Sequence, residues 1–210
     1  MKKAFTLIEL LIVVAIIAIL AAIAVPNFLE AQTRAKVSRT KSDMRTLATA
    51  IESYAVDNNR IPREFNYGQY GDVLVNPQSG STVTGLSGIM WWGVSTPIAY
   101  ITSVYFPDVF QDKNYNAALD EQYYTYQDLL MRQKNGLFSA TFAQAAIDFY
   151  GTWRMISVGP DKLFAHPGVT NSVQLAYDPT NGTVSMGNIF RSQSLSESRE
   201  PVVGTLIGPH

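Results

Sequence analysis

The chain has 210 residues, a formal net charge of −1 at pH 7 and no cysteine. The lack of cysteine excludes disulfide bonds and thiolate metal sites, and a charge this close to zero provides no chain-wide basic field for nucleic acid. The length leaves room for one membrane helix and a single further domain of ordinary size.

The first predicted element is an apolar helix over residues 5–25. At about 1.5 Å per residue this helix reaches about 31 Å, which matches the roughly 30 Å thickness of the bilayer hydrocarbon. Lys2 and Lys3 precede the helix, and the next basic residue is Arg34. This charge bias predicts a spanning helix with a cytoplasmic N-terminus.

A single charged residue, Glu9, interrupts the apolar run. A carboxylate inside a spanning helix costs on the order of 2.5–3.5 kcal/mol and persists only where it has a partner or a task. A plain membrane anchor does not account for Glu9, and neither does a secretory signal peptide cut after Ala24. A new amino terminus created just before Phe5 would supply a positive charge to pair with Glu9.

The segment AFTLIELLIVVAIIAILAAIAVP resembles the N-terminal signature of type IV pilins and of the pseudopilins of type II secretion systems. The resemblance implies that a prepilin peptidase removes residues 1–4 by cutting between Ala4 and Phe5, and that the new amine of Phe5 is methylated. It also implies that Glu9 pairs with the terminal amine of a neighbouring subunit, and that Pro26 loosens the helix. Ala4 departs from the family, which usually has glycine at that position.

Helical periodicity continues through residues 26–59, where apolar residues recur three or four positions apart. We expect a kink or a locally unwound segment just before Pro26, because proline removes a backbone hydrogen bond. Asn58, Asn59 and Pro62 are predicted to end the helix. This second half is amphipathic, and its apolar stripe should pack on the globular domain. The stripe consists of Phe28, Ala31, Ala35, Met44, Leu47, Ala48, Ile51, Tyr54 and Ala55.

The same half of the helix carries a basic stretch, opposed nearby only by Glu30 and Asp43. Two interpretations stay open for it. It is either a solvated face, or a set of side chains that meet lipid headgroups before assembly and acidic patches on neighbouring subunits afterwards. Its members are Arg34, Lys36, Arg39, Lys41 and Arg45.

Residues 60–190 are predicted to form one globular domain. Residues 65–93 are rich in glycine, serine and asparagine, which indicates an irregular segment. Thr96 and Pro97 predict the start of a short helix that continues to residue 103. Residues 123–126 favour a strand, and short helices are expected over residues 127–136 and 141–149.

The C-terminal part is predicted to be rich in strands. Residues 153–158 favour a strand that residues 159–161 turn, and a hairpin is expected from residues 173–177 and 183–186 around Asn181-Gly182. Residues 191–210 are expected to form a mobile tail.

A second resemblance concerns calcium. WRMISVGPDK and YDPTNGTVSMGNIFRS resemble the part of major pseudopilins in which a loop region binds calcium. The resemblance implies Ser157, Asp161 and Asp178 as candidate ligands, since calcium takes oxygen ligands that tight turns bring together. Lys162 stands where the family tends to have glycine. The alternative is a turn in which Asp161 caps backbone N–H groups. No other cofactor is expected.

The sequence contains no P-loop, no G-x-S-x-G or H-E-x-x-H motif and no cysteine nucleophile, which argues against an enzyme. The predicted fold is α+β, with a long N-terminal helix packed on a small antiparallel sheet. The first half of the helix would span the membrane, and the second half is amphipathic.

The resemblance implies a structural subunit of a type II secretion pseudopilus. The subunit would sit in the inner membrane with its domain in the periplasm. An assembly platform and its ATPase would draw it into a homo-oligomeric filament with minor pseudopilins, and the filament would drive protein export. No nucleic-acid partner is expected. The alternatives are a type IV pilus pilin for adhesion, motility or DNA uptake, and a Sec-exported soluble binding protein.

Overall fold

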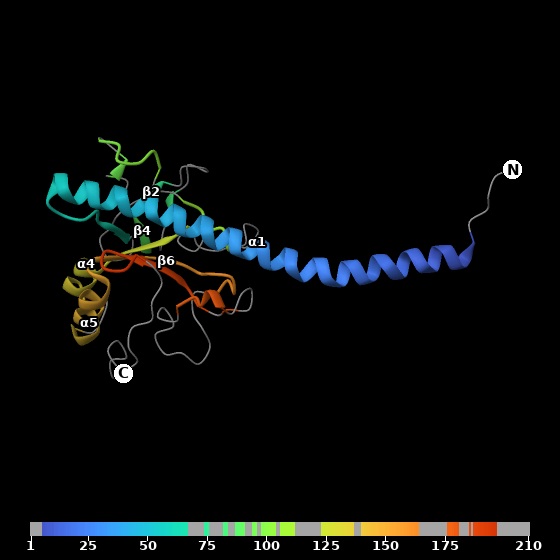
Figure 1. Cartoon of the computed structure of the whole chain (residues 1–210). Helices are drawn as coiled ribbons and strands as arrows, with labels where there is room; N and C mark the ends of the chain where they lie inside the picture. Colours follow the sequence, from blue (N-terminus) through green and yellow to red (C-terminus); the bar gives the residue numbers. More distant parts are fainter. Residues whose placement is uncertain are drawn as a thin grey trace.

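The computed structural model shows one long helix, α1, projecting from a small domain of strands and short helices (Figure 1). The residues it describes are 6–66, 74–75, 82–83, 87–90, 94–95, 98–103, 106–111, 123–136, 140–163, 176–180, 185 and 187–196. The elements in chain order are α1 (Leu7–Asn58), β1 (Glu64–Asn66), β2 (Leu74–Val75), β3 (Thr82–Val83), β4 (Ser87–Met90), β5 (Thr125–Asp128), α4 (Leu129–Lys134), α5 (Ala140–Tyr150), β6 (Trp153–Ser157) and β7 (Ile189–Ser192). This α+β arrangement confirms the fold class predicted from the sequence.

Both ends of α1 are defined by local signals. Thr6 caps the N-terminus and forms a capping box with Glu9. At the other end Asn59 adopts a left-handed conformation with φ of 55°, which asparagine tolerates better than most residues, and Pro62 follows. The predicted end of the helix is therefore confirmed.

Pro26 lies inside α1, and the helix passes through it without a break. The locally unwound segment expected before Pro26 is therefore not seen, and Figure 1 shows only a gentle bend. The residues just before Pro26 are mostly alanine and aliphatic side chains, several of them strong helix formers. Their propensity is sufficient to keep the turn helical although one backbone hydrogen bond is missing.

The main core lies between the second half of α1 and the three-stranded sheet. Buried residues of α1 between positions 44 and 54 pack with Trp153 and Met155 of β6. Burying one large aliphatic side chain contributes about 1.5–3 kcal/mol, so this contact holds the helix on the sheet. The predicted apolar stripe is thus confirmed in its later part, whereas Phe28 is 63% exposed and does not pack on the domain.

The three-stranded sheet is antiparallel in the order β5-β6-β7. All five residues of the central strand β6 are buried, because α1 and α5 lie on opposite sides of the strands (Figure 1). On the α5 side, the ring of Tyr150 lies 6.1 Å from the ring of Phe190 and 4.8 Å from the guanidinium carbon of Arg154. A smaller apolar cluster of α4 and α5 closes this side.

Two predictions about the middle of the chain are wrong. Residues 65–93 were expected to be irregular, yet β1 pairs with β4 and β2 with β3. β1 and β4 are distant in sequence, so local composition does not reveal their pairing, whereas β2 and β3 form a short local pair that the glycine- and serine-rich composition obscured. Residues 98–103 are not helical. Tyr100 donates its backbone N–H to the carbonyl of Val94 and its hydroxyl to Asp57, so these contacts override the local helix signal.

Other predicted elements are confirmed. α4, α5 and β6 lie where the sequence indicated, and β5 begins two residues later than expected. Residues 173–175, 181–184 and 186 of the predicted hairpin lie outside the described residues. β7 includes Arg191 and Ser192, so the sheet extends into the segment expected to be a mobile tail. Residues 197–210 of that segment also lie outside the described residues.

Candidate functional site

The exposed half of α1 is the largest apolar surface in the described part of the chain. Its large aliphatic side chains, from Leu7 at 80% exposure to Leu29 at 52%, point into solvent. This stretch is long and apolar enough to cross a membrane. An apolar surface of this extent marks contact with lipid or with other protein. The apolar helix predicted from the sequence is therefore present from Leu7 onward, and its length and composition suit a membrane span.

Glu9 is held at the start of this apolar surface by Thr6. Its Oε2 accepts hydrogen bonds from the backbone nitrogen of Thr6 at 2.9 Å and from the Thr6 hydroxyl at 2.6 Å. In return, the Thr6 hydroxyl accepts a bond from the Glu9 backbone nitrogen at 3.3 Å. The negative charge therefore sits at the positive end of the helix dipole. Among the described residues, Oε1 of Glu9 has no hydrogen-bond donor.

The capping role of Glu9 is a function that the sequence interpretation missed. The signal was present, because Thr6 and Glu9 have the threonine and glutamate spacing of a capping box before an apolar run. Ala4 and Phe5 lie outside the described residues. Cleavage between them, and the pairing of Glu9 with a neighbouring amine, therefore stay predictions.

Polar contacts tie the second half of α1 to the sheet beside the apolar core. The indole nitrogen of Trp153 donates to Glu52 at 2.9 Å, and the hydroxyl of Tyr124 donates to Asp43 at 3.1 Å. These bonds add to the apolar contacts that hold the docked half of α1 on the domain.

Of the candidate calcium ligands, Ser157 ends β6, whereas Asp161 and Asp178 lie outside the helices and strands; a side-chain oxygen of each accepts a backbone hydrogen bond. Asp161 Oδ1 accepts from Leu163 N at 3.2 Å, and Oδ2 accepts from Gly187 N at 3.1 Å. Asp178 Oδ1 accepts from the backbone nitrogen and hydroxyl of Thr180. Ser157 is buried, and its oxygen lies 3.4 Å from the nitrogen of Gly159. These contacts are those of the turn-capping alternative.

The donor set around these turns does not by itself suit calcium. Calcium takes about six to eight oxygens, usually with several carboxylates. The described residues contain no group of three or more His, Cys, Asp or Glu side chains that could hold a metal ion. Calcium binding by Ser157, Asp161 and Asp178 thus stays a prediction, and no step of the proposed function depends on it.

Asp108 is a structural carboxylate beside the same turn. It is 3% exposed and accepts hydrogen bonds from Phe110 N and Val158 N, both at 3.0 Å. Burial raises the pKa of Asp108 above its usual range. Asp108 joins residues 106–111 to the end of β6, a role that no sequence motif indicated.

A buried polar cluster joins α4, β1 and the end of β5, close to the C-terminal end of α1. Arg132 of α4 forms an ion pair with Glu64, and Glu64 also accepts from Asp128 N at 3.1 Å. Asp128 caps α4 through Met131 N at 2.9 Å, and burial raises its pKa to about 6. These groups bond to one another and to backbone, so they stabilise the fold around α4.

Comparison with known proteins places the N-terminal segment. The prokaryotic N-terminal methylation motif matches residues 1–25. The type IV major pilin protein PilA of Myxococcus xanthus is 53% identical over 59 residues, which are 28% of this chain and 27% of PilA. The type IV major fimbrial protein FimA of Dichelobacter nodosus is 40% identical over 94 residues, 42% of this chain and 60% of FimA. The type II secretion system core protein G of Pseudomonas aeruginosa is 41% identical over 61 residues, 29% of this chain and 43% of that protein.

Each match spans less than two thirds of the relative's length, and no solved structure matches the chain. The methylation motif overlaps most of the exposed apolar part of α1, which begins at Leu7. The N-terminal segment of this chain is therefore similar to those of type IV pilins and of the type II secretion core protein G.

Proposed function

We propose that this chain is a structural subunit of a type II secretion pseudopilus, a helical filament that drives protein export. The observation that carries the proposal is the division of α1 into an exposed apolar half and a half docked on the sheet. The exposed half suits a membrane before assembly and a bundle of neighbouring helices afterwards. The docked half would display the domain on the outside of that bundle.

Assembly follows from the chemistry of Glu9. A prepilin peptidase would remove residues 1–4 and leave a charged amine on Phe5. In the apolar interior of a filament, a carboxylate and an amine from adjacent subunits attract each other much more strongly than in water. Either charge left unpaired there would be costly, so subunits in the wrong register would be rejected. Oε1 of Glu9, which has no donor among the described residues, would accept this contact.

The cellular setting is part of the same proposal. The charge bias around α1 supports a cytoplasmic N-terminus in the inner membrane with the domain in the periplasm. An assembly platform and its ATPase would draw the processed subunit into a filament with minor pseudopilins.

A type IV pilus pilin is the second candidate, and it is favoured by the relatives named as pilins and fimbrial proteins. The absence of cysteine and the segments around Ser157 and Asp178 support the pseudopilus. Deletion of the gene in its native host distinguishes the two. We expect loss of secreted proteins from the medium with unchanged sheared surface filaments. Loss of the surface filaments with normal secretion would show a pilus instead.

Mass spectrometry of the N-terminal peptide from the native host tests the class of protein. We expect a chain that begins at methylated Phe5. A chain that begins at Val25 would contradict the filament proposal, because Glu9 would have been discarded with a signal peptide. A chain that retains Met1 would contradict processing between Ala4 and Phe5.

A further inference from the structure

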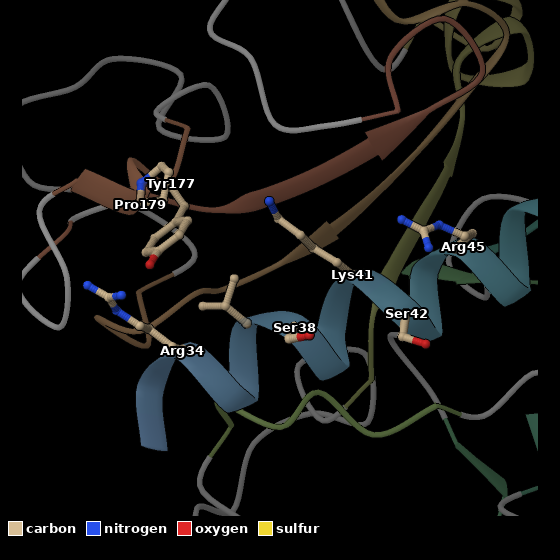
Figure 2. A pocket seen from close by; sticks show the side chains of 8 residues that line it. Arg34, Ser38, Lys41, Ser42, Arg45, Tyr177 and Pro179 are labelled. Atoms are coloured by element: carbon tan, nitrogen blue, oxygen red, sulfur yellow. The ribbon is translucent and has the colours of Figure 1, made fainter. Parts of the chain in front are cut away.

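A groove of about 540 Å³ lies between the docked half of α1 and the segment around Tyr177 (Figure 2). One wall is the helix, and the other is formed by Tyr177 and Pro179. The groove is separate from the apolar half of α1 and from Glu9. It therefore needs an account that the apolar half of α1 and Glu9 do not supply.

Three cations line the helical wall of this groove: Arg34, Lys41 and Arg45. They are seven and four residues apart, so they fall on one face of α1 and extend over about 17 Å along its axis. Ser38 and Ser42 also line the groove from the helix, between the charged residues in sequence, although Figure 2 shows the Ser42 side chain pointing away from those of Lys41 and Arg45. Guanidinium and ammonium groups in one row are donors for oxyanions.

Two of these cations lack internal partners. Arg34 pairs with Glu30, but Lys41 and Arg45 have no ion pair or side-chain hydrogen bond to any described residue. Arg191 adds positive charge nearby. Burial first and the charge of Arg45 second lower the pKa of Arg191, which shows that the guanidinium groups of Arg191 and Arg45 lie close enough to repel each other. The buried Nε of Arg191 also has no hydrogen-bond acceptor among the described residues. The negative charges at the margins are Glu30 and Asp178, so the groove has a net positive charge.

The described carboxylates of a second copy are poor candidates for filling the groove. Every described Asp and Glu side chain already accepts at least one hydrogen bond within its own chain. By contrast, several surface cations have no such partner among the described residues, including Lys36 and Arg60. A carboxylate of a second copy would therefore reach the groove with part of its acceptor capacity already used, whereas an external oxyanion brings all of its oxygens.

Lipid headgroups can reach only the end of the groove that is nearer the apolar half of α1. The exposed apolar run ends at Leu29, and the polar layer of a bilayer adds about 5–8 Å on each side. Along the helix axis Arg34 lies about 8 Å beyond Leu29, whereas Lys41 and Arg45 lie about 18 and 24 Å beyond it. Lipid headgroups can therefore meet Arg34, but they do not account for the other two cations.

We propose that this groove binds a soluble, extended ligand that carries two or more phosphate or sulfate groups. One oxyanion would be held by Arg34 at the end nearer the membrane, and another between Lys41 and Arg45. This assignment does not rest on the proposed function, because the groove is complete within one chain.

The test uses the full chain in non-ionic detergent micelles, with tripolyphosphate as the probe in titration calorimetry. The variant K41Q/R45Q removes two charges from the groove. The matched control K36Q/R60Q removes one lysine and one arginine that are exposed and outside the groove. We expect tripolyphosphate affinity to fall at least about tenfold in the groove variant, since charge-assisted hydrogen bonds are lost, and less than about twofold in the control. Inorganic phosphate can occupy only one of the two proposed oxyanion positions. It should therefore bind at least about tenfold more weakly than tripolyphosphate.

Three results would overturn the proposal. Equal losses of affinity in the groove variant and the control would show that tripolyphosphate responds to positive charge anywhere on the protein, not to the groove. No binding of tripolyphosphate by the unaltered chain would show that the groove is not a site for such ligands. Binding of phosphatidylglycerol vesicles that depends on Lys41 and Arg45, without binding of tripolyphosphate, would assign the groove to the membrane.

Discussion

The two halves of α1 belong to one unbroken helix and have opposite surroundings. The first half, from Leu7 to Leu29, is covered by nothing in the described chain, whereas residues 37–54 bury one face against the sheet. Both halves contain large aliphatic residues, so hydrophobicity alone does not decide which half packs on the domain. In the first half apolar residues surround the helix, and in the second they are confined to one stripe. A stripe can be covered by one sheet, but an apolar cylinder needs lipid or several neighbours.

The largest effect is expected from Glu9→Ala in the exposed half. Loss of the carboxylate should abolish incorporation into filaments, because the neighbouring amine would remain unpaired in an apolar environment. Membrane insertion should be unchanged, since alanine is easily accommodated in a spanning helix. Filament incorporation can be measured by shearing and immunoblotting, with membrane fractionation beside it. Glu30→Ala serves as the control and should assemble. Normal assembly of Glu9→Ala would disprove the docking role.

An isoleucine-to-alanine substitution in each half of α1 tests the difference between the two halves directly. Ile51→Ala, at a fully buried position, should lower the free energy of unfolding by about 2–5 kcal/mol, because it leaves a cavity in the main core. Ile16→Ala, at a position 52% exposed, should change it by less than about 0.5 kcal/mol. Thermal unfolding of the full chain in detergent, followed by circular dichroism, measures both. Similar losses in the two variants would mean that the halves do not differ as described.

A pH effect is expected on the domain side only. The pKa of Asp128 is about 6 in the folded protein, above its ordinary value of 3.8, because burial disfavours the charged form. The folded state therefore holds this proton more tightly than the unfolded state. The resulting stabilisation is present below about pH 4 and is lost as the pH rises through about 6.

Asp128→Asn keeps a capping oxygen for α4 and removes the titration. The difference in unfolding free energy between the variant and the unaltered protein should therefore shift in favour of the variant, by about 2 kcal/mol, between pH 4 and pH 7. Chemical denaturation at several pH values measures the shift. A difference that stays constant across this range would show that Asp128 titrates normally.

The smallest effect is expected at the turn after β6. Asp161→Ala should lower the free energy of unfolding by about 1 kcal/mol in the presence of EDTA, because Leu163 N and Gly187 N lose their acceptor. Added calcium should leave this difference unchanged if Asp161 only caps the turn. A loss that appears only when calcium is present would instead establish the carboxylate as a calcium ligand. Denaturant titration with and without calcium separates the two outcomes.

Local features of the sequence determined the parts of the fold that depend on near neighbours. The apolar run and its periodicity predicted both halves of α1, and Asn58, Asn59 and Pro62 predicted its end. α4, α5 and β6 were also predicted, because helical spacing and alternation are visible within a few residues. The importance of Glu9 followed from the cost of a charge in an apolar run.

Only the tertiary structure decided features that join distant segments. The pairing of β1 with β4, the burial of Asp108 and the loss of the helix expected over residues 98–103 all depend on contacts with other parts of the chain. The groove also depends partly on local sequence and partly on the tertiary structure. The spacing of Arg34, Lys41 and Arg45 was present in the sequence, but the opposite wall at Tyr177 is more than 130 positions away. A local pattern can show which face of a helix carries charge, whereas the packing of the whole chain decides what that face meets.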